Sequence, residues 1–412
     1  MNKLGLSLIF IGILFSCKDP QPLLPKTGVW RAELITMDNA VLPFNFKLEK
    51  DSVGKHFMEI YNADEVIRIN DVEVGNDSIK IRMDVYEGYI SGTYTPNEIK
   101  GEFIKESLDR IVPFTATHGI HERFYADTSI EDVSGVWETE FSANTADSYM
   151  AKGIFDQKGN KVSGTFRTTT GDYRYLEGVM DNDSLKLSAF DGAHAFLFMA
   201  KVSDSSINGT FYSGNHFKEP FVGRRNAGFE LPDEDALTYL KEGYDKLSFS
   251  FPDAEGKPIS LEDEQFKDKV VIVQIMGTWC PNCMDETKFY VNYLKEHNPA
   301  DLKFVGLAFE YAKTEEAAFS GIKRLQERIG VPYPILLAQY GSSNKERAQE
   351  KLPMLNHVLS YPTSIFVDKK GTVRKIHTGF NGPATGEKFI LFQKEFNDFV
   401  TLLLEEESAY SK

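Results

Sequence analysis

The chain has few cysteines and no excess of positive charge. Only three of its 412 residues are cysteines, Cys17, Cys280 and Cys283, so no further cysteine pair is left for a structural cross-link. Lysine and arginine number 46 against 61 aspartates and glutamates, and the net charge of −15 argues against nucleic acid as a partner. The eight histidines show no metal-ligand spacing, so neither a metal nor another cofactor is expected.

Long apolar runs are also scarce, and the clearest one lies at the N-terminus. A basic start precedes the apolar residues 4–15, which are too few for an ordinary membrane span and are typical of a signal peptide. Residues 14–17 (Leu-Phe-Ser-Cys) resemble a bacterial lipobox, which implies cleavage before Cys17 and lipidation of its thiol. We therefore predict a signal peptide at 1–16 and a tether at 17–26.

This N-terminus predicts a protein that is lipid-anchored in the cell envelope and faces the periplasm or the cell surface. Lipid chains hold a protein at a membrane because each buried methylene adds about 0.8 kcal/mol. An uncleaved anchor or a plain secretory signal is the alternative interpretation.

An internal repeat occupies the first half of the mature chain. Residues 28–30 (Gly-Val-Trp) recur at 135–137, and residues 76–78 (Asn-Asp-Ser) recur at 182–184. The offset is about 107 residues at both positions, and chance matches would not keep one register. The sequence therefore predicts a duplicated region, with one β repeat at 27–120 and a second at 130–225.

Each copy has the pattern of an all-β unit. Phe44, Phe46 and Leu48 alternate with polar residues, and turns follow one another at short intervals with no long helical pattern between them. We expect each copy to form a curled or closed antiparallel sheet. Trp30 and Trp137 are interpreted as core plugs rather than as ligand contacts.

The pattern changes after a charged linker at 226–246, in which a short helix is expected around 235–240.

From residue 247 to 412 the sequence alternates predicted strands and helices. A capping Thr314 and a terminating Gly330 bound one of these helices. The resulting order β-α-β-α-β-β-α is that of a thioredoxin fold. The fold class predicted for the chain is multidomain, a C-terminal α/β thioredoxin fold preceded by the all-β duplicated region. The expected elements are strands at 270–276, 304–309, 364–367 and 373–376, and helices after 280, at 314–330 and over 389–403.

Residues 279–283 (Trp-Cys-Pro-Asn-Cys) follow the predicted buried strand directly. Cys280 then lies at a helix N-terminus, where the helix dipole lowers the thiol pKa and creates a nucleophile. Cys283 lies one turn later and can resolve a mixed disulfide, or form a disulfide with Cys280. A zinc ribbon would need a second Cys-x-x-Cys motif, which this sequence lacks.

Glu286 lies three residues after Cys283, on the same predicted helix face. A partly buried carboxylate at this position can take the proton of the resolving thiol. The alternative is a surface glutamate that merely complements the helix dipole.

These features together resemble the membrane-anchored, thioredoxin-like disulfide reductases of the TlpA/ResA type, over residues 247–404. The resemblance implies that Cys280 attacks, that Cys283 resolves and that Glu286 is the acid/base. It also implies that Pro362 is the cis-proline of a substrate groove, although an X-Pro before a strand is often only a turn. Gln274 departs from the family, because thioredoxins carry a buried Asp there. The residues that carry the resemblance are Phe251 to Asp253, Gly256, Lys257, Lys269, Trp279 to Cys283, Glu286, Tyr361 to Thr363, Phe366 to Gly371 and Gly379.

The predicted function is a thiol:disulfide oxidoreductase that reduces disulfides of envelope proteins with electrons from a membrane thiol donor. Trp279, Pro281, Tyr361, Pro362 and Thr363 are its predicted substrate-binding residues. A thiol-dependent peroxidase is one alternative, disfavoured because Gly277 stands where such enzymes carry a threonine. The other is a binding lipoprotein whose β repeats hold a ligand or partner.

The segment 338–359 is longer than in compact relatives and is expected to add a helix that ends at Pro353.

Overall fold

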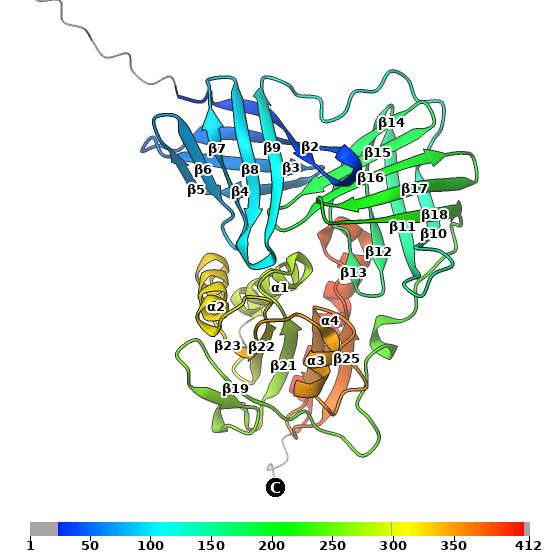
Figure 1. Cartoon of the computed structure of the whole chain (residues 1–412). Coiled ribbons are helices and arrows are strands. Elements are labelled where there is room, and N and C mark those ends of the chain that lie inside the picture. The colour runs from blue at the N-terminus through cyan, green and yellow to red at the C-terminus, as the bar shows by residue number, and fades with distance from the viewer. Residues whose placement is uncertain (1–23, 298, 408–412) are drawn as a thin grey trace, which may run out of the picture.

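The computed structural model describes residues 24–297 and 299–407. The predicted signal peptide and the lipidation site Cys17 lie outside the described residues. In the described part of the chain, two antiparallel β units precede an α/β domain (Figure 1). None of the described helices combines the length and the apolar character that crossing a membrane requires.

The first β unit is a curled nine-stranded sheet within the described residues, in the order β4-β3-β2-β1-β9-β8-β7-β6-β5. Consecutive strands are neighbours except β4 and β5, which lie at the two ends of the order, and β9 returns to pair with β1. The alternation predicted from Phe44 and Phe46 places both side chains in the core. Its strands are β1 Gly28–Ile35, β2 Val41–Lys50, β3 His56–Asn62, β4 Glu65–Ile69, β5 Asp71–Val74, β6 Ser78–Arg82, β7 Tyr89–Tyr94, β8 Glu98–Lys105 and β9 Arg110–His118.

The second β unit has the order β11-β10-β18-β17-β16-β15-β14-β12-β13. Its strand β11 also pairs with β12, so the sheet closes on itself. The short β13 pairs with the end of β12 and lies on the side toward the C-terminal domain (Figure 1). The strands are β10 Gly135–Phe141, β11 Tyr149–Lys158, β12 Lys161–Thr168, β13 Gly171–Asp172, β14 Leu176–Asp181, β15 Ser184–Phe190, β16 Ala195–Val202, β17 Ser206–Ser213 and β18 Phe217–Arg225.

Trp30 and Trp137 are fully buried in the two β units, which confirms that they are core residues. Each indole N–H donates to a backbone carbonyl four residues earlier, that of Lys26 at 3.0 Å and that of Val133 at 2.8 Å. A buried indole needs such a partner, because an unpaired N–H in the core costs about 1–3 kcal/mol.

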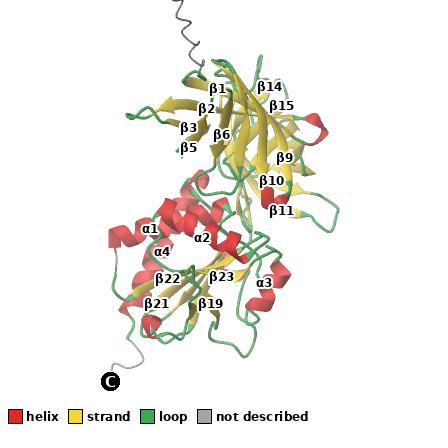
Figure 2. Ribbon diagram, turned by 60° about the vertical axis from the view of Figure 1, so that its left-hand side comes forward, coloured by secondary structure: helices red, strands yellow, loops and turns green. Residues whose placement is uncertain are grey.

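The C-terminal domain has a mixed five-stranded sheet in the order β23-β22-β21-β24-β25, in which β24 runs antiparallel to β21. The helices α1 and α2 lie between this sheet and the β units (Figure 2). Phe289 of α1 contacts Phe392 and Phe396 of α4, so these two helices pack together. The elements are β19 Ser250–Pro252, β20 Pro258–Ser260, β21 Val270–Met276, α1 Pro281–His297, β22 Leu302–Phe309, α2 Glu315–Ile329, β23 Ile335–Gln339, α3 Lys345–Lys351, β24 Thr363–Val367, β25 Val373–Thr378 and α4 Glu387–Glu405.

Several predicted details of this domain and of the linker before it are confirmed, and three are wrong. Thr314 caps α2 by accepting from the N–H of Ala317, and Gly330 ends that helix with a φ of 72°. The predicted element order lacked β23, whose short apolar run after Pro334 forms the edge of the sheet beside β22. The helix expected around 235–240 is only a 3₁₀ turn at Glu234–Ala236. The extra helix in 338–359 is α3, which ends at Lys351 rather than at Pro353.

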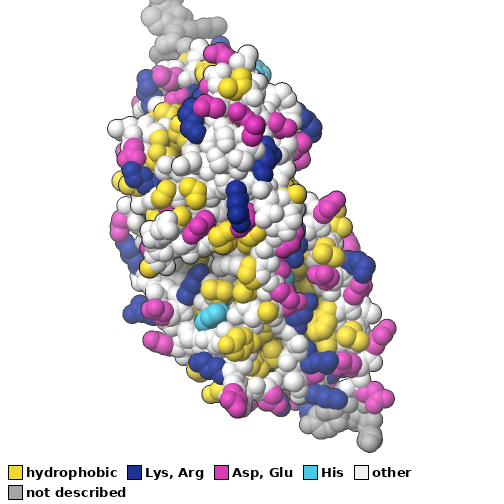
Figure 3. Space-filling view, turned by 90° about the vertical axis from the view of Figure 1, so that its right-hand side faces the viewer, with side chains coloured by type: hydrophobic (Ala, Val, Ile, Leu, Met, Phe, Trp, Pro, Cys, Tyr) yellow, Lys and Arg dark blue, Asp and Glu magenta, His cyan; other side chains and the backbone are white. Residues whose placement is uncertain are grey.

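Acidic and basic side chains are interspersed on the face that includes the second β unit and the C-terminal domain (Figure 3). Interspersed charges favour solubility without building a field of one sign over this face.

Candidate active site

Cys280 and Cys283 form a disulfide at the junction between β21 and α1, with their Cα atoms 5.2 Å apart. The fully buried strand β21 leads into the loop, and α1 begins at Pro281, a residue well suited to the first helical position. Cys280 is 6% exposed and Cys283 is completely buried. Both cysteines are thus buried, and Cys280 is the less buried of the two.

The surroundings of Cys280 favour a thiolate once the disulfide is reduced. The backbone N–H of Cys283 donates to the Cys280 sulfur at 3.2 Å, and the N-terminus of α1 contributes its positive dipole end. Both interactions stabilise negative charge on sulfur, and the thiolate is the reactive form of a cysteine.

The loop before β24 meets the Cys-x-x-Cys motif. The Tyr361–Pro362 peptide bond is cis, the isomer that the family resemblance implied. The Cys280 sulfur lies 3.4 Å from the carbonyl oxygen of Tyr361, and the Tyr361 ring packs edge-on against Trp279 with centroids 5.5 Å apart. Thr363, the first residue of β24, pairs with Ile275 of β21. The structure thus brings Trp279, Cys280, Pro281, Tyr361, Pro362 and Thr363 together.

Glu286 is completely buried beneath Cys283, so the alternative of a surface glutamate is wrong. Its carboxylate accepts from the side-chain amide of Gln274 at 2.8 Å and from the hydroxyl of Ser364 at 2.9 Å. Burial raises the pKa of Glu286, although these hydrogen bonds oppose the shift.

Gln274 forms hydrogen bonds with both the resolving cysteine and Glu286. Its amide N–H₂ donates to Glu286 and also to the carbonyl oxygen of Cys283 at 3.2 Å. Its amide oxygen accepts from Thr287 at 3.1 Å, which fixes the orientation of the amide. The residue that replaces the usual buried Asp therefore holds Glu286 near the second cysteine.

A second buried carboxyl group, Glu310, holds the loop before the cysteines. It follows β22 and accepts from the backbone N–H of Thr278 at 2.7 Å and from the Thr278 hydroxyl at 2.8 Å. Burial raises the pKa of Glu310 to about 7. Sequence reasoning missed this residue, because a single Glu after a strand carries no motif.

The second β unit lies directly on the Cys-x-x-Cys motif. The Asp172 carbonyl in β13 accepts from the amide of Asn282 at 3.1 Å, and the Asp172 carboxylate accepts from the N–H of Gly382 at 2.6 Å. The Ser360 hydroxyl donates to the Thr170 carbonyl at 2.8 Å. A Cβ atom on Gly171 would lie 2.2 Å from the Asn282 amide nitrogen, so only glycine permits this approach.

Arg174 forms ion pairs with residues of all three parts of the molecule. Its guanidinium pairs with Glu65 of the first β unit, with Asp191 of the second at 3.3 Å and with Asp285 of α1. Its side chain is only 4% exposed, so these pairs are largely removed from water. The contact between the β units and α1 is therefore built around a buried ion cluster.

The mixed sheet, the Cys-x-x-Cys disulfide at a helix N-terminus and the adjacent cis-proline define a thioredoxin-like thiol-disulfide oxidoreductase. Residues 241–388 match the Redoxin family model, so the C-terminal domain is a redoxin domain.

Curated relatives agree with this class. The chain is 28% identical over 141 residues to the "Thioredoxin-like protein YneN" of Bacillus subtilis, which is 34% of this chain and 73% of that protein. It is 26% identical over 140 residues to the "Thiol-disulfide oxidoreductase ResA" of the same organism, which is 34% of this chain and 69% of the relative. A solved structure of a thioredoxin-family thiol:disulfide interchange protein from Chlorobium tepidum is 22% identical, with a TM-score of 0.30, and the match covers 40% of this chain and 98% of that one. The two β units lie almost wholly outside the Redoxin match.

Proposed function

We propose that this oxidoreductase reduces disulfides of cell-envelope proteins and is itself returned to the dithiol by a membrane thiol donor. The observation that carries the proposal is the position of Cys280, which is the less buried cysteine of the pair and lies at the N-terminus of α1 beside the cis-proline loop. The predicted lipidation of Cys17 would place the enzyme at a membrane surface, where such substrates occur.

The reaction proceeds in two exchange steps. The Cys280 thiolate attacks one substrate sulfur, and the other substrate sulfur leaves as a thiolate and takes a proton. Cys283 then loses its proton to Glu286 and attacks the Cys280 sulfur, which expels the second substrate sulfur as a thiolate. This thiolate takes a proton from water, so the substrate leaves as a dithiol, and Glu286 returns its proton to water. The substrate gains two electrons and two protons, and the enzyme keeps the Cys280–Cys283 disulfide until the donor reduces it.

Trp279, Pro281, Tyr361, Pro362 and Thr363 are proposed to bind the substrate chain. They lie around the Cys280 sulfur, and the backbone before the cis-proline places a carbonyl 3.4 Å from it. An extended peptide can pair with backbone groups of such a loop, which gives affinity with little dependence on its sequence.

The proposal is tested by following the reduction of insulin disulfides by the full-length protein, with dithiothreitol as the electron source. A rate well above that of dithiothreitol alone supports a disulfide reductase. A rate equal to this chemical background would contradict it.

Replacing Glu286 with Gln should slow the second step while leaving the first unchanged. Because burial raises the pKa of Glu286, the carboxyl group becomes a base only as the pH rises through that raised value. We expect resolution of the mixed disulfide to accelerate with pH in the wild type, and to be about a hundredfold slower and less pH-dependent in the variant. Rapid acid quenching after mixing reduced protein with a small disulfide measures both steps.

The attack by Cys280 provides the internal control for this prediction, because Glu286 contacts Gln274 and Ser364 rather than Cys280. An unchanged resolution rate with an unchanged pH profile would remove Glu286 from the mechanism.

We propose further that the β units, 27–120 and 130–225, arose by duplication and that 247–412 is a separate domain joined to them by the linker. Gly28 and Gly135 support this, with φ values of 111° and 107° before the two buried tryptophans. Both tryptophans also make the same hydrogen bond to a carbonyl four residues earlier.

A further inference from the structure

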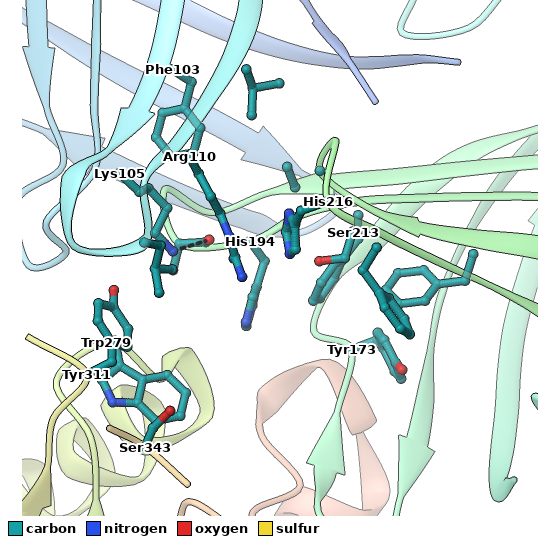
Figure 4. A pocket seen from close by; sticks show the side chains of 18 of the residues that line it. Phe103, Lys105, Arg110, Tyr173, His194, Ser213, His216, Trp279, Tyr311 and Ser343 are labelled. Atoms are coloured by element: carbon teal, nitrogen blue, oxygen red, sulfur yellow. Dashed lines mark hydrogen bonds between the residues drawn. The ribbon is translucent and has the colours of Figure 1, made fainter. Parts of the chain in front are cut away.

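A cavity of about 540 Å³ lies where the two β units face the C-terminal domain (Figure 4). The first β unit contributes Lys105 and Arg110, the second contributes His194 and His216, and Trp279 lies on the opposite wall. As Figure 4 shows, the basic side chains point toward the space above Trp279. The cavity is thus built from all three parts of the chain and reaches the residue next to Cys280.

The cavity carries positive charge that has few partners. Within residues 24–297 and 299–407, no hydrogen bond or ion pair involves the side chain of Arg110 or that of His216. Lys105 donates only to the carbonyl oxygen of Ala193, at 3.0 Å. Glu219 is the one acidic residue of the lining, and it is already engaged by the hydroxyls of Ser142 at 2.6 Å and Tyr149 at 2.8 Å.

The pKa values of two of these groups are lowered. Burial and, after it, the positive charge of Arg110 lower the pKa of Lys105 to about 8, although Asp191 and Glu87 oppose the shift. The pKa of His216 falls to about 4, first by burial and then through Arg110, Lys105 and His194. Both shifts indicate that the cavity disfavours positive charge, and a bound anion would raise these pKa values again.

The remaining walls are apolar. They include Phe103, Phe196 and Phe211, and Tyr311 extends the aromatic surface beside Trp279. A few charged groups within apolar walls, in a volume of several hundred Å³, is the usual composition of a site for an organic ligand.

The second β unit covers the opposite side of the motif. There, Asp172 accepts hydrogen bonds from the Asn282 amide and from the backbone N–H of Gly382. The carbonyl of Thr170 accepts a hydrogen bond from the Ser360 hydroxyl. A disulfide that reaches Cys280 therefore approaches from the side of Trp279, which is the side on which the cavity lies.

We propose that this cavity binds a carboxylate-bearing, partly apolar group of the disulfide substrate, and that Arg110 selects for it. The inference rests on the proposed function and adds the substrate class. The carboxylate pairs with the free guanidinium of Arg110, and the apolar portion contacts the phenylalanine wall. Arg110 is a specificity-determining residue here, since the cavity that it lines does not include Cys280.

The test compares two small disulfides, oxidised glutathione, which carries carboxylates, and cystamine, which carries only ammonium groups. Reduced full-length protein is mixed with each, and the rate of oxidation is measured at pH 7. We expect Arg110→Gln to lower the rate constant for oxidised glutathione about tenfold, because a charge-assisted contact is lost, and to leave the rate constant for cystamine within about twofold.

Arg224→Gln is the matched control, because Arg224 is an exposed arginine of β18 paired with Glu138. It makes the same change of net charge away from the cavity and should alter neither rate constant. Equal losses for both disulfides in Arg110→Gln, or equal losses in the two variants, would overturn the proposal.

A binding measurement separates this inference from the redox chemistry. Calorimetric titration of oxidised glutathione into full-length Cys280→Ser protein reports the cavity without any exchange step. We expect binding that Arg110→Gln weakens about tenfold. An unchanged affinity would overturn the cavity proposal, whereas binding without any oxidation of the wild-type enzyme would overturn only the proposed function.

Discussion

The Cys280→Ser variant should lose the disulfide-reducing activity by about a thousandfold or more. Serine preserves the size of the side chain, but its hydroxyl is not ionised at neutral pH and cannot attack a disulfide. The N–H of Cys283 and the dipole of α1 stabilise charge on the atom at this position, and only sulfur supplies that charge. The insulin-reduction assay measures the loss.

Cys283→Ser separates the two thiol roles. It should also fail to turn over, yet it retains the first attack and so consumes one equivalent of disulfide per protein molecule. Substantial turnover by Cys280→Ser would show that another group is the nucleophile.

Arg174→Gln should have the largest effect on stability. The substitution leaves Glu65, Asp191 and Asp285 without their shared cation in a site that is largely removed from water. Breaking a buried ion pair by removing one partner costs about 3–5 kcal/mol. We expect this loss in denaturant titrations of the full chain, together with faster modification of reduced Cys280 by a thiol reagent as the β units detach from α1.

Arg224→Gln is again the matched control, because its ion pair with Glu138 lies at the surface and is worth less than about 1 kcal/mol. Equal denaturation midpoints for the two variants would show that the cluster around Arg174 does not hold the three parts together.

The chemistry of the site could be predicted from the sequence because its signals are local. The Cys-x-x-Cys spacing after an apolar strand is contained within residues 270–283, and so is the placement of Cys280 at the start of a helix. The capping of α2 by Thr314 and its end at Gly330 likewise depend on nearest neighbours along the chain.

The elements that could not be predicted depend on contacts between distant residues. Asp172 meets Gly382 across 210 positions, and no pattern near either residue indicates the partner. The strand β23 is short and lies at the sheet edge, and a run of five residues is too short for its periodicity to identify a strand. The cavity beside Trp279 exists only because both β units lie against the C-terminal domain.

The central claim, that Cys280 attacks disulfides of other proteins, is tested most directly by trapping substrates. Full-length Cys283→Ser protein is produced in its native envelope, and the adducts are separated without and then with reductant. We predict reducible adducts of higher mass on Cys283→Ser and their absence from the Cys280→Ser, Cys283→Ser double variant. Adducts equally abundant on both variants, or absent from both, would contradict the claim.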